Sequence, residues 1–337
     1  MFKKYKEKFI GDREFYANLI RLIIPMIVQQ GITSFVSLLD NVMVGRLGTE
    51  SMSGVAIVNQ LLFVFNLTIF GGLAGASIFG AQFYGKGDHK GVRYALRFKL
   101  IFSVLMAVIA IVALLFFNSP LISLFLTESE SGGDLVLTLS EAKNYLFVML
   151  IGLIPFSFSQ SYSSTLRETG ETVSPMTASI IAIVTNFVLN YILIFGKFGA
   201  PALGITGAAI ATLTSRVLEF VIVAVYAPRY RRVPLMLRLL LRPGGAMARS
   251  FLKYATPVLV NEVLWGLGVS VMTAVMGHMA ISTDMLAAHA IMGNIDKFST
   301  VACFGIAGAT AVIVGKRIGE GAGREEVYSL GCCLLTV

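Results

Sequence analysis

The chain is poor in charged residues, in histidine, in cysteine and in tryptophan. Only 14% of its 337 residues are Asp, Glu, Lys or Arg, whereas soluble domains usually contain about 25%. The three cysteines lie in apolar stretches and lack the spacing of a disulfide framework or a C-x-x-C motif. The sequence also contains no His/Glu zinc motif, no G-x-S-x-G and no paired catalytic aspartates. These absences argue against a soluble enzyme and against an enzyme within the membrane.

Long apolar runs are abundant. Apolar residues make up 56% of the chain, and the mean hydropathy is +0.79. Runs of about 20 residues are long enough to cross a hydrocarbon layer about 30 Å thick as helices. We therefore predict an all-α polytopic membrane protein with about eight complete helices and the start of a ninth. The predicted helices cover residues 18–42, 51–79, 92–117, 142–164, 175–195, 205–227, 252–277 and 285–314, and the ninth starts near 327.

Positive charge is distributed unevenly between the two sides of these helices. The net charge is +8, and the N-terminal segment and every second loop, including 86–99, hold 22 Lys and Arg residues. The opposite loops hold three, which are Arg46, Lys143 and Lys197. Because cytoplasmic loops carry the excess of Lys and Arg, we place the N-terminus in the cytoplasm and the chain in the cell (inner) membrane. The net charge is then explained without a nucleic-acid partner.

The two halves of the chain match each other at a nearly constant offset. Pro25 corresponds to Pro257 at an offset of 232, and Gly85 corresponds to Gly319 at an offset of 234. Six predicted helices lie between equivalent points, so both repeats enter the membrane in the same direction. Such repeats are related by an axis along the membrane normal, which predicts two parallel lobes of six helices each.

This repeat defines the expected domains. They are a cytoplasmic N-terminal segment (1–17), an N-lobe of six helices (18–228), a basic cytoplasmic linker (229–251) and an incomplete C-lobe (252–337). The second repeat reaches only its third helix, so we expect about three to four further helices in a complete C-lobe. We therefore interpret the chain as a C-terminally truncated product or a fragment.

Asp40 is the strongest candidate for a functional residue on physical grounds. A carboxylate within a spanning helix costs at least about 2.5–3.5 kcal/mol on insertion scales, so it normally faces a cavity and has a function. Gln29 and Thr33 lie on the same helical face and form a polar stripe with Asp40. The alternative is that Asp40, near the outer end of its helix, reaches interfacial water.

Other polar residues within the predicted helices have both a functional and a structural interpretation. Asn186 and Asn190 share a face and could offer carbonyl oxygens to a cation or hydrogen bonds to Asp40, or could join neighbouring helices. Arg216 and Glu219, three residues apart, are interpreted as a mutually neutralising pair. The same interpretation is favoured for Asp296 with Lys297, although Asp296 also faces the same half-lobe as Glu262. Pro257 could be a helix-start residue instead of a kink.

Several motifs resemble those of the multidrug and toxic compound extrusion (MATE) transporters. They are Pro25 with Gln29 and Gln30, residues 40–48 (DNVMVGRLG), residues 75–82 (GASIFGAQ) leading to 85–88 (GKGD), and Pro257 followed by Asn261 and Glu262. The match covers essentially the whole chain in family order. The resemblance implies a twelve-helix antiporter of two lobes that uses an inward Na⁺ or H⁺ gradient to export cationic amphipathic compounds. It implies no cofactor other than the coupling ion.

The resemblance also assigns roles to individual residues. Asp40 matches the cation-binding aspartate of the family's N-lobe, and Glu262 becomes the C-lobe acid for a cation or the substrate, next to Asn261. We accordingly expect a coupling Na⁺, where one is used, at Asp40 or Glu262, with Asp296 as a further candidate. Some family members have an acid at the position of Asn190, so a relay of two carboxylates in the N-lobe is in doubt here. Pro25 and Pro257 are expected to kink their helices.

Two other functions remain open on the sequence. A lipid-linked oligosaccharide flippase of related architecture would need several basic residues in its cavity, whereas we count only Arg216 and Lys297 within the helices. A membrane fragment without transport activity is the second alternative. For a transporter we expect a monomer that binds small cationic amphipathic molecules in the lipid bilayer. The coupling ion and the substrate range are not determined by the sequence.

Overall fold

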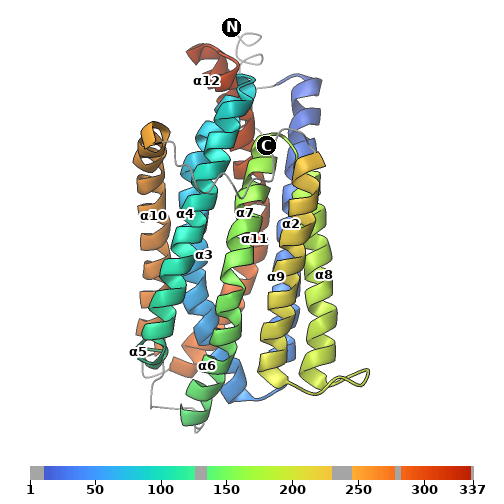
Figure 1. The fold of residues 1–337 in the computed structure, drawn as a ribbon, viewed down its shortest axis with the longest axis vertical. Helices are drawn as coiled ribbons and strands as arrows, with labels where there is room; N and C mark the ends of the chain where they lie inside the picture. The colour runs from blue at the N-terminus through green and yellow to red at the C-terminus, as the bar shows by residue number, and fades with distance from the viewer. Residues whose placement is uncertain (1–10, 126–134, 230–244, 278–281, 335–337) are drawn as a thin grey trace.

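The protein is an all-α polytopic membrane protein. The computed structural model describes residues 11–125, 135–229, 245–277 and 282–334, and in these ranges the regular structure is helical, without strands (Figure 1). Seven helices are long and apolar enough to cross a membrane, or up to eight if one bent pair forms a single span. The predicted fold class is confirmed. The helices are α2 (Arg13–Gly45), α3 (Thr49–Gly85), α4 (His89–Phe116), α5 (Asn118–Ser123), α6 (Leu135–Ile151), α7 (Leu153–Glu168), α8 (Val173–Phe195), α9 (Gly204–Arg229), α10 (Gly245–Gly277), α11 (Ser282–Gly319) and α12 (Arg324–Leu334).

One predicted helix is in fact two. Residues 142–164 were expected to form a single span, but α6 and α7 meet at a bend of 46° around Gly152. Pro155 lies one turn into α7 and has no N–H to offer the carbonyl group of Ile151, so the continuous helical ladder is interrupted there. The predicted outer loop 118–141 also contains the short helix α5 and the first turns of α6. Most helices extend several residues beyond the predicted limits, because their polar ends continue past the apolar runs.

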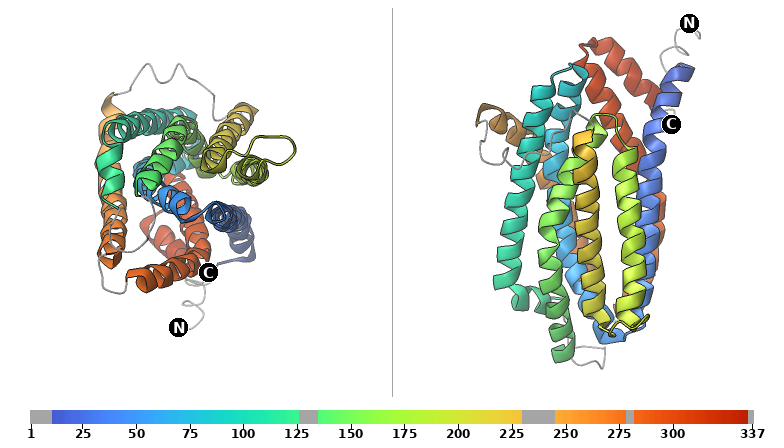
Figure 2. Two further views of the ribbon diagram at one scale, coloured as in Figure 1. Left: turned by 90° about the horizontal axis from the view of Figure 1, so that it is seen from below. Right: turned by 45° about the vertical axis from the view of Figure 1, so that its right-hand side comes forward.

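Helix α3 occupies the middle of the bundle. It packs against α4, α6 and α7 on one side and against α10 and α11 on the other (Figure 2). The largest apolar core is built around it and includes Val58, Leu62 and Ile69 of α3 with Leu146 of α6 and Ala209 of α9. Helices α2, α8 and α9 form a second packed group, in which α8 contacts both of the others. This group contains the polar side chains described below.

The two sequence repeats give helices of matching length. Helices α2 and α10 contain 33 residues each, while α3 contains 37 and α11 contains 38. Pro25 and Pro257 lie at the same distance from the start of their helices, and both are in the helix interior. Pro257 is therefore not a helix-start residue, because α10 begins at Gly245, well before the predicted residue 252.

The repeats also contact each other symmetrically. A Cβ atom added to Gly85 of α3 would collide with the carbonyl oxygen of Lys316 in α11. A Cβ atom added to Gly319, the repeat equivalent of Gly85, would collide with the carbonyl oxygen of Gln82. Each glycine thus lets the backbone of the other repeat come close. At this point α3 and α11 cross in direct backbone contact at the end of the bundle where α2 begins (Figure 1).

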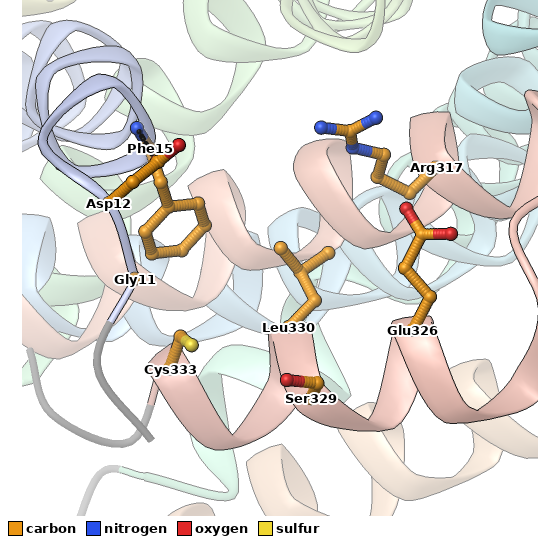
Figure 3. Close-up of a pocket in the computed structure, with 8 residues that line it drawn as sticks. All are labelled: Gly11, Asp12, Phe15, Arg317, Glu326, Ser329, Leu330 and Cys333. Carbon is orange, nitrogen blue, oxygen red and sulfur yellow. Dashed lines mark hydrogen bonds between the residues drawn. The ribbon is translucent and has the colours of Figure 1, made fainter. Parts of the chain in front are cut away.

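Helix α12 lies across the same end of the bundle. Its Glu326, Ser329, Leu330 and Cys333 face the first residues of α2 across a small cavity of about 200 Å³ (Figure 3). Leu334 joins a small apolar cluster with Leu19 of α2 and Ala309 of α11. None of the site residues predicted from the sequence lines this cavity.

Candidate cation site

The carboxylate of Asp40 lies at the interface of α2 with α8 and is partly buried. The Oδ1 atom of Asp40 accepts a hydrogen bond of 2.7 Å from Nδ2 of Asn190. The oxygen and nitrogen of the Asn186 amide can be placed in two ways, and its neighbours favour the orientation in which the Asn186 nitrogen donates to Asp40 Oδ2 at 3.1 Å. In that orientation its oxygen accepts from the hydroxyl and the backbone N–H of Thr212 on α9, both at 3.2 Å. Two neutral amides therefore hold the two oxygens of one carboxylate.

The spacing of four residues between Asn186 and Asn190 places both amides on one face of α8. Only 7% of Asn186 and 2% of Asn190 is exposed, so their amides are removed from solvent. The Oδ1 atom of Asn190 is buried and has no hydrogen-bond partner within the described part of the chain. Buried polar atoms nearly always have a partner, so this oxygen is an available ligand beside a carboxylate. The sequence prediction that these asparagines could contact Asp40 agrees with this geometry.

Thr212 was not among the candidates from the sequence. It lies on α9, and no local spacing connects it with α2 or α8. Carboxylate, amide and hydroxyl oxygens are the ligands that hard cations prefer. Asp40, Asn186, Asn190 and Thr212 together form the candidate cation site.

Gln29 belongs to a different group of side chains. Its Nε2 atom donates to Oγ of Ser179 on α8 at 2.8 Å, and Ser179 in turn donates to Oε1 of Glu219 on α9 at 2.7 Å. The hydroxyl of Thr33 donates to the backbone carbonyl of Gln29 within the same helix. The predicted polar stripe is therefore divided: Asp40 contacts Asn190, whereas Gln29 contacts Ser179, about three turns away along both helices.

The expected ion pair between Arg216 and Glu219 does not form within the described part of the chain. Glu219 accepts its hydrogen bond from Ser179, and the guanidinium of Arg216 lies 5.0 Å from the ring centre of Phe156. Three residues along a helix bring Cβ atoms close, but the two side chains turn toward different neighbours. The prediction of mutual neutralisation is corrected accordingly.

The second predicted acid, Glu262, has no side-chain hydrogen bond within the described residues, unlike Asp40. It is partly buried on α10, and its Cβ and Cγ atoms pack beside Gly71 of α3. Asn261 and Asp296 are exposed, while the side chains of Lys297, His278 and His289 lie outside the described set. Within the described residues, no hydrogen bond or ion pair connects Glu262, Asn261 or Asp296 with the candidate cation site around Asp40.

A buried ion pair between Lys99 of α4 and Glu168 of α7 was not predicted from the sequence. The Lys99 side chain is 0% exposed and also donates to Oγ of Ser164 at 2.8 Å. The sequence prediction groups Lys99 with the basic loop 86–99, although α4 begins at His89 and places Lys99 about three turns inside the helix. Its position inside an apolar run was the signal that could have identified it.

Comparison with known proteins agrees with this architecture. The family model MatE matches residues 25–192. A Thermotoga maritima protein named "Probable multidrug resistance protein NorM" is 29% identical, over 98% of this chain and 68% of its own length. An Agrobacterium fabrum protein of the same name is 27% identical, over 94% of this chain and 68% of its own length.

Solved structures show the same fold. A structure described as the outward-facing conformation of a multidrug resistance MATE family transporter superposes with a TM-score of 0.80 at 23% identity, covering 97% of this chain and 70% of its own. A MATE structure in the straight conformation gives a TM-score of 0.80 at 22% identity, covering 97% of this chain and 71% of its own. This chain therefore belongs to the multidrug and toxic compound extrusion family, whose members are membrane transporters and not enzymes.

Proposed function

We propose that the protein is a cation-coupled antiporter that exports cationic amphipathic compounds by alternating access. Residues 18–228 would form the N-lobe and residues 252–337 would belong to the C-lobe, joined by the linker 229–251. Inward movement of Na⁺ or H⁺ would drive the export. The names of the two relatives point to multidrug resistance. The observation that carries the proposal is the arrangement of Asp40, Asn186, Asn190 and Thr212 in the candidate cation site, called the Asp40 group below.

The Asp40 group has the composition of a site for the coupling cation. It combines one carboxylate with amide and hydroxyl oxygens, and the buried Asn190 Oδ1 atom has no hydrogen-bond partner among the described residues. A bound Na⁺ would use Asp40 and Asn190 Oδ1 as oxygen ligands, whereas a proton would need only the carboxylate. Asp40 binds one positive charge at a time, so a cationic compound and the coupling ion would compete for it. This competition is sufficient for antiport.

Glu262 is proposed as the acid of the C-lobe that binds the second cation or the substrate, together with the adjacent Asn261 and with Asp296 of α11. Its lack of a hydrogen-bond partner within the described residues leaves it accessible to a ligand. Pro25 and Pro257, which each remove one helical hydrogen bond, would let α2 and α10 bend during the transport cycle. We further propose a monomer in the cell membrane with a cytoplasmic N-terminus, in agreement with the distribution of Lys and Arg.

A flippase for lipid-linked oligosaccharides would need a cavity lined by several basic side chains. Besides Arg216 and Lys297, the helices contain Lys99 in α4 and Arg167 in α7. However, Lys99 is paired with Glu168, and Arg216 lies against Phe156. A similar structure, 23% identical with a TM-score of 0.77, is described as a transporter whose binding pocket has reversed polarity. The carboxylate at the centre of the Asp40 group favours cation binding here.

Ethidium efflux from membrane vesicles tests the proposal. An imposed Na⁺ or H⁺ gradient should drive ethidium transport by the wild-type protein, and Asp40→Asn should lower the driven rate roughly five- to 150-fold, the usual range of coupling between two sites. The matched control is Glu325→Gln, which removes an exposed acid of α12. Dependence on one gradient alone identifies the coupling ion. Driven efflux that survives Asp40→Asn at the wild-type rate would contradict the proposal.

A further inference from the structure

The guanidinium group of Arg216 lies at the bend between α6 and α7. Its Cδ and Nη1 atoms are 3.3 and 3.6 Å from the position that a Cβ atom would take at Gly152, and its central carbon is 5.0 Å from the ring centre of Phe156. Helix α6 ends at Ile151, and the C-terminal end of a helix favours a cation. Because a guanidinium group stays charged in proteins, the bend holds a fixed positive charge inside the bundle.

This charge lies close to the candidate cation site. Arg216 follows Thr212 by four residues on α9, so the two side chains share a helix face with an axial separation of about 6 Å. Thr212 is the member of the Asp40 group that contacts Asn186. Tyr145 of α6 is close enough to both Arg216 and Asp40 for a Coulombic interaction with each. The structure therefore places a fixed cation beside the Asp40 group without direct contact to its carboxylate.

The acids around Arg216 do not balance its charge fully. Glu219, three residues further along α9, is close enough for a Coulombic interaction with Arg216 and with Arg167 of α7. Arg167 interacts in the same way with Glu168, which already forms the ion pair with Lys99. In this set of five side chains, three cations share two acids. Nη1 of Arg216 is also buried without a hydrogen-bond partner among the described residues, so positive charge remains uncompensated next to the candidate cation site.

We propose that Arg216 sets the affinity of the Asp40 carboxylate for cations. The inference deepens the proposed function, on which it rests, because both the coupling ion and the exported compound would bind at Asp40. A fixed positive charge that does not contact the carboxylate repels each of these ligands without occupying their site. Transport requires that a bound ion can also leave, and the repulsion keeps binding weak enough for release. Arg216 acts through its charge and touches neither ligand.

Ethidium binding to the purified protein tests this role at equilibrium. Two unit charges about 10 Å apart change an affinity roughly tenfold at an effective dielectric constant of about 20. Arg216→Gln should therefore lower the ethidium Kd roughly tenfold, whereas Arg216→Lys keeps the charge and should stay within about threefold of the wild type. Arg324→Gln, which removes an exposed base of α12, should bind as the wild type does. An unchanged or higher Kd in Arg216→Gln would overturn the proposal.

Glu219→Gln is the variant with the opposite sign. It keeps an acceptor for the hydrogen bond from Ser179 but removes a negative charge beside Arg216, so the ethidium Kd should rise. A general disturbance of packing would instead weaken binding in both variants. A Kd that does not rise in Glu219→Gln would overturn the proposal, even if Arg216→Gln failed to fold. Asp40→Asn should raise the Kd more than Glu219→Gln does, because Asp40 contacts the ligand and Glu219 acts at a distance. The reverse order would place the ligand at Glu219 and overturn the proposal.

The same repulsion should act on the coupling ion. Ethidium is added well below its Kd, and the concentration of Na⁺ or of protons that displaces half of the bound dye is measured for each variant. For the ion that displaces ethidium from the wild type, this concentration should fall roughly tenfold in Arg216→Gln. Displacement at the wild-type concentration in Arg216→Gln would overturn the proposal, because a charge at Arg216 acts on every cation at Asp40.

These measurements are separate from the test of antiport, because they need no ion gradient. Absence of gradient-driven efflux in the wild type would contradict the proposed function, while binding to the Asp40 group could still be measured. Wild-type efflux combined with an unchanged ethidium Kd in Arg216→Gln would contradict the role of Arg216 alone.

Discussion

Two carboxylates in the same bundle have opposite surroundings. Glu168 is paired with the ammonium group of Lys99, and their side chains are 4% and 0% exposed. Asp40 is partly buried, and its two oxygens are held by the neutral amides of Asn190 and Asn186. A carboxylate that already has a buried counter-ion has little affinity left for another cation, whereas one held by amides retains its full charge. The difference separates a structural ion pair from a candidate binding site.

The packing around Glu168 also differs from the packing around Asp40. Beside Glu168, a Cβ atom at Gly80 would collide with the carboxylate, so this glycine makes room for the closed pair. Beside Asp40, the Oδ1 atom of Asn190 is buried without a partner. Within the described residues, Oε2 of Glu168 is likewise buried without a hydrogen-bond partner, so the two groups differ in charge: only the Glu168 group contains a counter-ion, Lys99 of α4. Substitutions that remove a charge should therefore act mainly on stability in the first group and mainly on function in the second.

Lys99→Met is the largest expected effect on stability. It leaves the Glu168 charge buried without its partner, which should lower the free energy of unfolding in detergent by about 3–5 kcal/mol. Lys99→Met combined with Glu168→Leu should recover most of this loss, because no uncompensated charge remains. Circular dichroism during chemical unfolding measures both variants against Lys90→Met, which alters an exposed lysine of the same helix. A double variant as unstable as Lys99→Met would show that packing, not charge, dominates this site.

Asn190→Leu should have an intermediate effect. It removes the 2.7 Å hydrogen bond to the Asp40 carboxylate, and hydrogen bonds to charged groups contribute about 1.5–3 kcal/mol. The free energy of unfolding should therefore decrease by an amount in this range. The concentration of coupling ion needed for half-maximal ethidium efflux should rise. Thr185→Val is the control, because Thr185 is partly buried on the same helix and its hydroxyl donates only to the Ile181 carbonyl in the described structure. Unaltered ion dependence in Asn190→Leu would remove Asn190 from the cation site.

Asp40→Asn should have the smallest effect on stability, in spite of its large expected effect on transport. The amide keeps the size of the side chain and one acceptor for Asn190 while the charge is removed, so the free energy of unfolding should change by less than about 1 kcal/mol. The same unfolding measurement shows whether this holds. A loss as large as that of Lys99→Met would mean that Asp40 also belongs to a structural charge network, and the contrast between the two sites would disappear.

Part of the site could be predicted because it depends on spacing along one helix. The four-residue interval of Asn186 and Asn190 places them on one face, and the charge of Asp40 within an apolar run marks it as functional. A hydrogen bond from these asparagines to Asp40 was one of the alternatives that the sequence left open, and the structure contains it. Thr212 and Ser179 were not predicted, because hydroxyl residues are common in membrane helices and only their neighbours on other helices give them a role.

The two wrong predictions, for the pair Arg216–Glu219 and for Lys99, have a related cause. Arg216 and Glu219 have the spacing of a helical ion pair, yet Glu219 turns to Ser179 and Arg216 to Phe156. Lys99 was counted with the basic loop 86–99 because of its charge, although the predicted helix 92–117 contained it and α4 begins ten residues earlier. In both cases the decisive partner lies on a different helix, at a sequence distance where local rules carry no information.

The sequence by itself determined the membrane class, the approximate positions of the helices, the repeat and the position of Asp40, because hydropathy and periodicity are properties of each segment. The tertiary structure decided which polar side chains meet: Lys99 with Glu168, Gln29 with Ser179 and Glu219, and Asp40 with two asparagines. It also decided that Gly85 and Gly319 let the two repeats touch at the backbone. In a medium without water, each buried polar group must find its partner on whichever helix packs against it, and packing is set by the whole bundle.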